Sequence, residues 1–314
     1  MEREATIRHA TWDDLAPVAA LFAARDTARH GRPELSAEEL AHDWGTEGFA
    51  LASDAWLAQA TDGTVLAYAD LLPDHPGTWA YEIALHPADE HIELERTLRA
   101  RVEQRAAAAA AAGGLAEARL RAFLPSHERA ALDRLRGDGY RFVCAFLRMR
   151  LDADAPAPAQ PWPAGVQAAE FDPERDAEAV HAVLAEAFED HVDVGGPGSY
   201  AQWRREVLGH PRLEPALWVL AREGERLVGA VVAFPEDGYG WVKALGVLRA
   251  ARGRGIAAAL LGEAIRRLRA HGLAAVELGV DAASPTGATR LYERAGMRLV
   301  RRTDVYEKRV PARA

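Results

Sequence analysis

The stretch RAARGRGIAAALLGEAIRRL, residues 249–268, gathers three arginines and two glycines directly before a segment with apolar residues at helical spacing. That spacing predicts a helix over the second half of the stretch. Because the first amides of a helix lack internal acceptors and the helix dipole makes this end positive, the loop before it can hold an anion. Gly253 and Gly255 would let a ligand approach the amides, and Arg252 and Arg254 add positive charge. We interpret the loop as a pyrophosphate cradle; a glycine-containing turn with solvated arginines is the alternative.

Two other phosphate-binding motifs fit this sequence poorly. Gly253-x-Gly255-x-x-Ala258 satisfies a dinucleotide-binding pattern, with Glu277 in the strand that follows. In that fold the first strand runs almost directly into the first glycine, whereas the five residues LRAAR separate Val247 from Gly253 here. The remainder of the chain after Gly253 is also too short for a doubly wound sheet. A Walker loop would need Gly-Lys followed by Ser or Thr, which the sequence lacks.

The composition is that of an ordinary acidic globular protein. The 314 residues carry a formal net charge of -9 at a sequence pI near 5.7, which argues against nucleic-acid partners because these need a basic face. No run of about 18 apolar residues exists, so we expect no membrane-spanning helix. The charged start MEREATIRHA predicts no signal peptide. The single cysteine, Cys144, lies in the apolar setting YRFVCAFL, typical of a buried core. We therefore expect a cytoplasmic protein without a membrane partner.

The chain reads as two copies of one pattern. The segment DADAPAPAQPWPAG, residues 152–165, is rich in Pro and Ala and predicts a stiff linker. Trp56 matches Trp218, 162 residues later, and the motif GYRF at 139–142 matches GMRL at 296–299, 157 residues later. The difference falls near an alanine run, where we expect the first copy to have the longer helix. This pattern indicates a duplicated domain and excludes a solenoid.

Capping and turn residues recur in both copies. Each copy has a short strand, two capped helices and a hairpin, followed by a strand, a long helix, a strand, a shorter helix and a last strand. The expected capping pairs are Thr11 with Asp14, Ser36 with Glu39, Asp172 with Pro173, and Ser199 with Gln202. The expected hairpin turns are Asp62-Gly63 and Glu223-Gly224.

Two motifs of the second copy resemble those of one enzyme family. The loop R252-G253-R254-G255-I256-A257 is similar to the acyl-CoA signature Q/R-x-x-G-x-G/A of the GCN5-related N-acetyltransferases. The stretch LGVDAASPTGATRLYERAGMRLV, 278–300, is similar to the last motif of that family. The resemblance covers roughly residues 166–310. It implies an α/β fold of two tandem domains, each a mixed, mostly antiparallel sheet flanked by helices. The expected boundaries are 1–151 for a degenerate domain, 152–165 for the linker and 166–314 for the acetyl-CoA-binding domain.

The resemblance also implies direct transfer of an acetyl group from acetyl-CoA, as cosubstrate, to a primary amine of a small molecule. A free backbone N–H of the strand ending in LGV would stabilise the oxyanion. Tyr292 would protonate the leaving thiolate, although an aromatic packed on an amphipathic helix is the alternative. Ser284 stands where the family often has Asn, which leaves one contact to the pantetheine arm open. The expected cosubstrate-binding residues are Leu245, Gly246, Val247, Arg252, Gly253, Arg254, Gly255, Ile256, Ala257, Ser284, Thr286 and Tyr292.

The general base is harder to assign. Glu189, Asp190 and His191 lie in AFEDHVDVGG, between the first two helices of the second copy, where this family lines its acceptor site. His191 is attractive because the ordinary pKa of histidine is near 6.5. A solvated helix end and a divalent metal held by Glu189, His191 and Asp193 are alternatives, and we assign no metal site. Lys243 could repel a cationic acceptor or point outward.

The first copy lacks the features of an acyl-CoA site. Glu90, Glu93 and Glu95 fall at the positions of Arg252, Gly255 and Ala257, and carboxylates facing a pyrophosphate would repel it. Leu135 falls at the position of Tyr292. We predict that the first domain does not bind acyl-CoA and that it buttresses the second domain or shapes the acceptor cleft.

Three functions compete at this point. The first is an N-acetyltransferase for a small amine, as a monomer or homodimer. The second is a non-catalytic acyl-CoA sensor or interaction protein. The third is a protein N-terminal or lysine acetyltransferase. The sequence retains Tyr292 beside the cradle, which favours an enzyme over a sensor.

Overall fold

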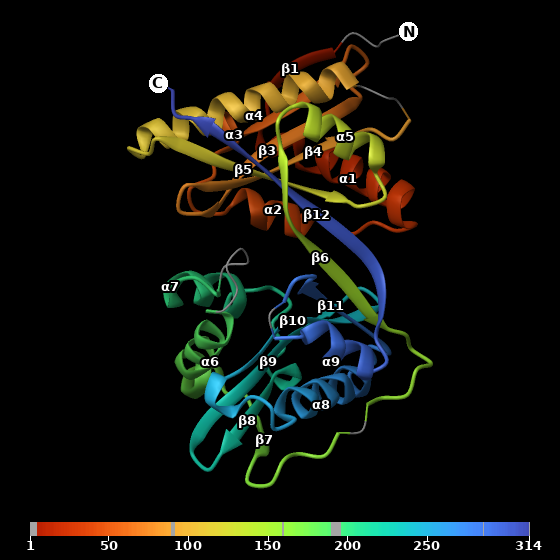
Figure 1. The fold of residues 1–314 in the computed structure, drawn as a ribbon. Helices are drawn as coiled ribbons and strands as arrows, with labels where there is room; N and C mark the ends of the chain where they lie inside the picture. Colours follow the sequence, from red (N-terminus) through yellow and green to blue (C-terminus); the bar gives the residue numbers. More distant parts are fainter. Residues whose placement is uncertain (1–4, 89–91, 159, 190–195, 285, 314) are drawn as a thin grey trace. The chain divides into compact units, whose positions relative to one another are not determined.

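The computed structural model describes residues 5–88, 92–158, 160–189, 196–284 and 286–313. It divides the chain into two compact units, coloured along the sequence in Figure 1. Unit 1 comprises Met1–Val143 and Val305–Ala314, and unit 2 comprises Cys144–Asp304. Each is a mixed sheet with helices packed on it, as the α/β assignment predicts.

Unit 1 contains a mostly antiparallel sheet. Its strands, in spatial order, are β1 (Ala5–His9), β2 (Ala55–Ala60), β3 (Val65–His75), β4 (Thr78–Leu85), β5 (Glu117–Pro125) and the C-terminal part of β12 (Arg298–Pro311). Neighbours from β1 to β4 are antiparallel, whereas β4 and β5 are parallel. The chain end is fixed beside β5, because the Ala312 amide donates to the Ala116 carbonyl over 2.9 Å.

Helices cover both faces of this sheet with separate apolar clusters. One face packs against α1 (Leu15–His30), α2 (Ala37–Trp44) and the short α3 (Leu51–Asp54), and the other against α4 (Ile92–Ala112) and α5 (Arg129–Gly137). Successive residues of β3 alternate between the two clusters: Tyr68 belongs to the first, whereas Ala67 and Ala69 belong to the second.

Unit 2 repeats this plan. Its strands, in spatial order, are β6 (Arg141–Leu151), β11 (Ala275–Asp281), β10 (Tyr239–Val247), β9 (Arg226–Glu236), β8 (Val219–Glu223) and β7 (Gln167–Glu170). β10 and β11 are parallel, whereas β6 with β11, β10 with β9, β9 with β8 and β8 with β7 are antiparallel. Its helices are α6 (Pro173–Phe188), α7 (Tyr200–Trp203), α8 (Ile256–Ala270) and α9 (Ala288–Arg294), with a π-helical turn at Arg204–Leu208.

Most local expectations are confirmed. Ser36 accepts from the Glu39 amide while Glu39 accepts from the Ser36 amide, and Asp172 caps α6 with Pro173 in its first turn. The helix after the cradle begins at Ile256 as predicted. The first copy has the longer helix, since α4 has 21 residues and α8 has 15. Cys144 is buried.

The observed units differ from the expected boundaries in their last strands. Residues 144–151 belong to unit 2, where β6 pairs with β11, and residues 305–314 belong to unit 1. The last strand of each copy therefore completes the sheet of the other. The apolar pattern of a strand indicates which of its faces is buried but not which of two similar sheets it joins, so the sequence did not reveal this exchange.

The Pro- and Ala-rich segment is part of unit 2 and not a free spacer. Asp152 pairs with Arg298 at 2.6 Å and accepts from Arg269 through its backbone carbonyl. A Cβ on Gly262 of α8 would lie 2.9 Å from the Pro158 carbonyl oxygen, so the segment runs directly against this helix. The stiffness expected from its composition thus serves a fixed path along one unit.

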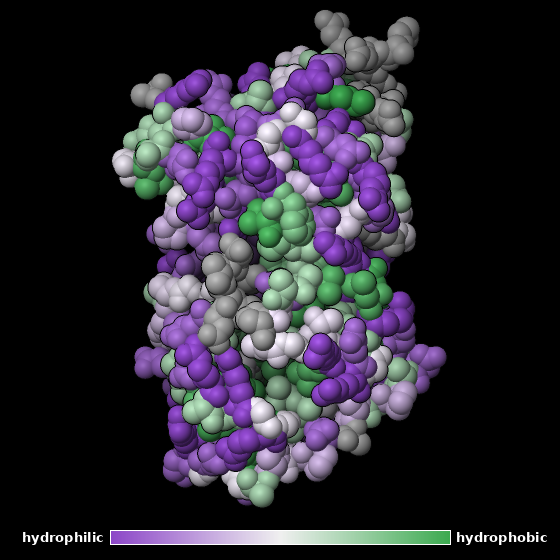
Figure 2. Space-filling model, viewed as in Figure 1, coloured by the Kyte–Doolittle hydropathy of each residue, from purple (hydrophilic) through white to green (hydrophobic). Residues whose placement is uncertain are grey.

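The surface of the described residues is mainly hydrophilic. Among the described helices, none has both the length and the apolar character needed to cross a membrane. Hydrophilic residues cover most of the face drawn in Figure 2, with apolar side chains scattered among them.

A buried carboxylate ties β6 to the sheet of unit 2. Glu277 on β11 is 2% exposed and accepts hydrogen bonds from Arg148 Nε and Arg150 Nη1, both at 2.5 Å. Arg148 also donates to the Tyr239 hydroxyl at 2.9 Å. Both arginines come from β6, so this ion triad holds the exchanged strand in register with β11.

We predict that Glu277→Gln lowers the free energy of unfolding by about 3 kcal/mol, because it leaves two guanidinium groups without their buried counter-charge. Urea unfolding followed by tryptophan fluorescence measures the loss. Glu263→Gln is the control: Glu263 pairs with Arg266 and Arg267 on its own helix, which predicts a loss below about 1 kcal/mol. Equal losses in the two variants would contradict a special role of the triad.

Candidate active site

A cavity of unit 2 lies where two parallel strands diverge. β10 and β11 pair only from Tyr239 with Ala275 to Val242 with Leu278. Beyond this point β10 continues beside β9 and β11 beside β6. A cavity of about 740 Å³ occupies the region, lined by both strands and by the starts of α8 and α9. Its size falls in the range of small-molecule sites.

A β-bulge accompanies the divergence. The register of β10 against β9 shifts between Val242 and Ala244, so Lys243 is the extra residue. On the far side of the bulge the Leu248 amide donates to the Val228 carbonyl of β9. Because amides alternate in direction along an antiparallel strand, those of Leu245 and Val247 point away from β9, toward the diverging β11. Two main-chain donors of the predicted LGV strand thus face the cavity.

The amino terminus of α8 forms one end of the cavity. Gly253 and Gly255 have φ angles of 77° and 86°, a left-handed conformation that favours glycine. A Cβ added to Gly253 would have no protein atom within 4 Å, so it would stand in the open space that a ligand would use. The first amides of a helix are oriented outward from such a terminus and suit an anion.

The two arginines of this loop have different partners. Arg252 Nε donates to the Val247 carbonyl at 3.2 Å and Arg252 Nη2 to the Ala187 carbonyl at 3.0 Å. Arg252 therefore ties the loop to the ends of β10 and α6. Arg254 Nη2 pairs with Glu223 at 2.7 Å, where both side chains are partly exposed. Such an exposed pair is weak, so a phosphate can replace the carboxylate.

Tyr292 lies on α9 and is one of the residues that line the cavity. The residue is 7% exposed, and burial raises the pKa of its phenol to about 12. Ser284 Oγ and Thr286 Oγ1 are 3.0 Å apart, and both residues also line the cavity. The lining thus contains a neutral hydroxyl donor as well as the main-chain amides of β10.

The structure brings together most of the residues singled out in the sequence. All of the expected cosubstrate-binding residues except Arg254 are among the described lining residues. Glu189 is exposed at the C-terminal end of α6 and does not appear among them, although its neighbours Ala187 and Phe188 do. His191, Asp190 and Asp193 lie outside the described residues.

Sequence reasoning missed several lining residues. Phe146 enters from β6, which the sequence assigned to the other domain, so its position followed only from the strand exchange. Arg290 and Arg294 project from α9, and Asp281 ends β11 and accepts from the Ala283 amide at 2.8 Å. The spacing of Arg290 and Arg294 around Tyr292 is the one signal that could have indicated them.

Known proteins match this chain in sequence and in fold. Residues 177–297, which include the bulged strand, the cradle and α9, match the model of the acetyltransferase (GNAT) family. A mycothiol acetyltransferase of Stackebrandtia nassauensis is 32% identical over 248 residues, 75% of this chain and 76% of that protein. The chain belongs to the GNAT acetyltransferase family.

Solved GNAT structures extend over both units. A GCN5-related N-acetyltransferase from Sphaerobacter thermophilus has a TM-score of 0.82 at 32% identity and covers 98% of this chain and 96% of its own. A tandem GNAT protein of the clavulanic acid pathway has a TM-score of 0.73 at 17% identity over 99% of this chain and all of its own, a likeness of fold alone. A mycothiol acetyltransferase of Thermobispora bispora is 36% identical over 171 residues. This alignment covers 51% of the present chain and about half (56%) of the length of that relative.

We predict that the phenol of Tyr292 stays neutral until the pH approaches about 12. Because the folded state raises this pKa above about 10, the linked stability is present below pH 10 and is lost as the pH rises through 12. Phenolate absorbance at 295 nm, taken as wild type minus Tyr292→Phe, isolates this group. A difference curve with its midpoint near 10 would show that the phenol is solvated.

Proposed function

We propose that the chain transfers an acetyl group from acetyl-CoA to a primary amine of a small molecule, using the cavity of unit 2. The observation that carries this proposal is a cavity at the diverging strands whose lining combines main-chain amides with a neutral phenol. Leu245 and Val247 of β10 and Tyr292 of α9 all line it. Family membership supports the reaction class, and the proposal extends it to this cosubstrate and acceptor.

The residues of the cavity suit acetyl-CoA. The start of α8, with Gly253 and Gly255, would hold the diphosphate, and Arg254 would exchange Glu223 for it. The apolar walls that Ile256, Leu245 and Val280 contribute would line the pantetheine arm. Arg252 acts as a positioning residue, because its guanidinium is committed to two carbonyls of the frame.

The reaction requires an oxyanion donor and a proton donor. Bound acetyl-CoA supplies a thioester carbonyl, where a C–N bond forms to the amine and the C–S bond breaks. An amide of Leu245 or Val247 would donate to the carbonyl oxygen as negative charge develops there. The Tyr292 hydroxyl would donate to the leaving sulfur, and its raised pKa keeps this proton in place at neutral pH. The nitrogen's surplus proton leaves through Glu189, His191 or solvent.

A small acceptor in a cytoplasmic setting is favoured by the relatives and by the chain's chemistry. Several relatives at 32–39% identity bear the name mycothiol acetyltransferase, which denotes a small-molecule acceptor. The buried Cys144 is the only cysteine and fits a reducing compartment. The net charge of -9 gives no reason to expect nucleic acid as a partner.

Tyr292→Phe should lower kcat by about 10²-fold and leave the Kd for acetyl-CoA nearly unchanged, because the lost proton acts only on the leaving sulfur. Thiol release from acetyl-CoA with a panel of small amines and peptides measures turnover, and calorimetry measures binding. Tight binding without turnover of any amine would favour an acyl-CoA sensor. Acetylation of peptides alone would favour a protein acetyltransferase.

Arg254→Glu should weaken acetyl-CoA binding about tenfold, because it places a carboxylate beside the diphosphate. Arg266→Glu is the matched control, since Arg266 is an exposed arginine of α8, the helix after the loop, and pairs with Glu263 away from the cradle. Both Kd values come from calorimetry. A similar loss in the two variants would indicate a general charge effect and contradict the cradle.

A further inference from the structure

Unit 1 has a second cavity at the corresponding place in its own sheet. β4 and β5 pair from Thr78 with Arg119 to Tyr81 with Ala122, after which β4 continues to Leu85 and β5 to Pro125. A cavity of about 280 Å³ lies there, lined by both strands and by α1, α4 and α5. The parallel pair therefore opens in both units, but the space it leaves in unit 1 is much smaller.

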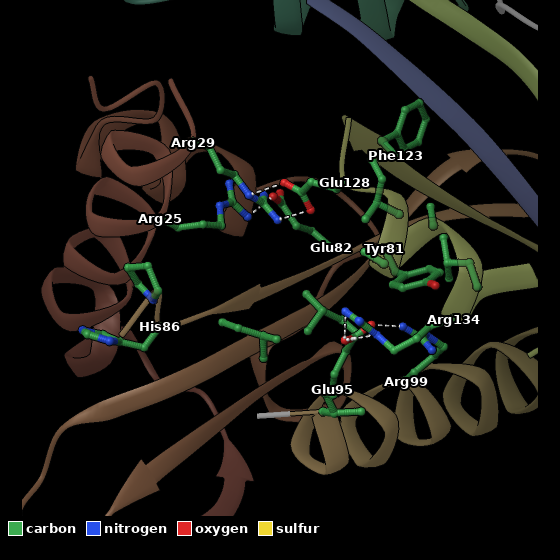
Figure 3. A pocket seen from close by; sticks show the side chains of 18 of the residues that line it. Arg25, Arg29, Tyr81, Glu82, His86, Glu95, Arg99, Phe123, Glu128 and Arg134 are labelled. Atoms are coloured by element: carbon green, nitrogen blue, oxygen red, sulfur yellow. Dashed lines mark hydrogen bonds and ion pairs between the residues drawn. The ribbon is translucent and has the colours of Figure 1, made fainter. Parts of the chain in front are cut away.

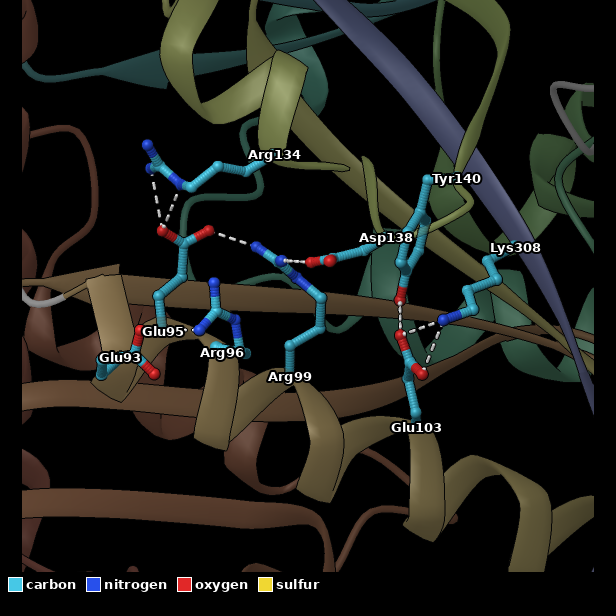
Figure 4. A network of polar contacts seen from close by, with 9 residues as sticks. All are labelled: Glu93, Glu95, Arg96, Arg99, Glu103, Arg134, Asp138, Tyr140 and Lys308. Carbon is cyan, nitrogen blue, oxygen red and sulfur yellow. Dashed lines mark hydrogen bonds and ion pairs between the residues drawn. The ribbon is translucent and has the colours of Figure 1, made fainter. Parts of the chain in front are cut away.

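This cavity is not built for a nucleotide thioester. Glu95, in the first turn of α4, takes the position that Ala257 has in α8 and is only 7% exposed. It pairs with Arg99, and with Arg134 at 2.8 Å (Figure 4). Arg99 pairs in turn with Asp138. A protein carboxylate thus already occupies the helix end where a diphosphate would have to bind.

Positive charge nevertheless converges on this cavity from two walls. Arg25 and Arg29 project from α1, and Arg99 and Arg134 from α4 and α5 (Figure 3). The described lining carboxylates are Glu82, Glu95 and Glu128, and Asp26 and Asp138 also pair with Arg25 and Arg99 from outside the lining. Burial and then the neighbouring Arg25 charge lower the pKa of Arg29, a cost that an added anion would relieve.

Two polar groups of the lining are buried with incomplete hydrogen bonding. Tyr81 Oη and Arg99 Nε, in residues that are 6% and 5% exposed, make no hydrogen bond of good geometry to a described residue, although the Tyr81 phenol interacts with Tyr140 and Arg99. Such groups are few in a native interior, and both can donate to an anion in the cavity. Two apolar residues of the lining, Phe123 and Ile92, are 44% and 40% exposed. The cavity therefore combines charged side chains with an exposed apolar border.

We propose that the cavity of unit 1 is a second ligand site, for a compact organic anion whose carboxylate or phosphate lies between the Arg25/Arg29 pair and the Arg99/Arg134 pair. A small apolar group of the ligand would contact Phe123 and Ile92. Guanidinium groups suit planar oxyanions because they donate two parallel hydrogen bonds. The site goes beyond the proposed acetyl transfer and does not depend on it.

The test is calorimetric titration of the full chain with benzoate, phenyl phosphate and inorganic phosphate, each with coenzyme A present at saturation so that the cradle of unit 2 is filled. We expect one-to-one, saturable binding of benzoate or phenyl phosphate, which decides between a carboxylate and a phosphate ligand. Arg134→Gln should weaken it at least tenfold. Glu95→Gln should strengthen it several-fold, because it removes a competing carboxylate. Arg96→Gln should have no effect, since the Arg96 side chain is exposed, lies about one helical turn before Arg99 and pairs with Glu93.

The two variants are expected to change the affinity in opposite directions, which makes the proposal falsifiable. A gain of affinity in Glu95→Gln cannot arise from misfolding, and thermal denaturation shows whether Arg134→Gln is folded. Absence of saturable binding by all three probes overturns the site, as does binding that neither Arg134→Gln nor Glu95→Gln changes. Binding of inorganic phosphate alone, with the same response to both variants, would overturn the organic ligand. None of these readouts uses turnover, so failure of the acetyltransferase proposal would be seen separately.

Discussion

The divergence of β10 from β11 beyond Val242 and Leu278 is the constraint on which the rest of unit 2 depends. Lys243, the extra residue of the bulge, shifts the alternation of β10. Gly240 consequently faces Leu268 of α8, whereas Gly246 faces Leu184 of α6. β10 and β11 separate, and main-chain N–H groups that a regular sheet would pair face a cavity instead. Unpaired main-chain groups cost free energy unless a ligand or water accepts their hydrogen bonds. The bulge therefore creates a cavity that favours a polar ligand.

The two units show how one topology supports different chemistry. In unit 1 the register of β3 and β4 has no shift from Ala67 to Pro73, so β4 lacks the bulge at the corresponding place. The parallel pair still opens, but side-chain charges of Glu95, Arg99 and Arg134 fill the helix end that glycines leave bare in unit 2. The difference lies in which groups meet a ligand first: amides in one unit and guanidinium groups in the other. Function therefore follows from the contents of the cleft and not from the fold.

The sequence predicted what local rules control. The helix start at Ile256, the caps at Ser36 and Asp172 and the hairpins each follow from a few neighbouring residues, and the structure has them. It could not predict the partners of long side chains, because these depend on tertiary distance. Arg252 faces two carbonyls and Arg254 faces Glu223, 31 residues away, although both lie in one motif. The strand exchange was equally hidden, since the apolar pattern of β6 or β12 sets which face is buried and not which sheet the strand joins.

That exchange has a consequence for what counts as a folding unit. Cutting the chain in the Pro- and Ala-rich segment would remove Met149 and Leu151 from the core of unit 2, where they are 2% and 0% exposed. It would also leave the buried Glu277 without either arginine and remove Phe146 from the wall of the cavity. An uncompensated buried carboxylate costs several kcal/mol, comparable to the net stability of a small domain. Neither sequence copy therefore forms a complete core by itself. The two copies must remain in one chain because the last strand of each completes the core of the other.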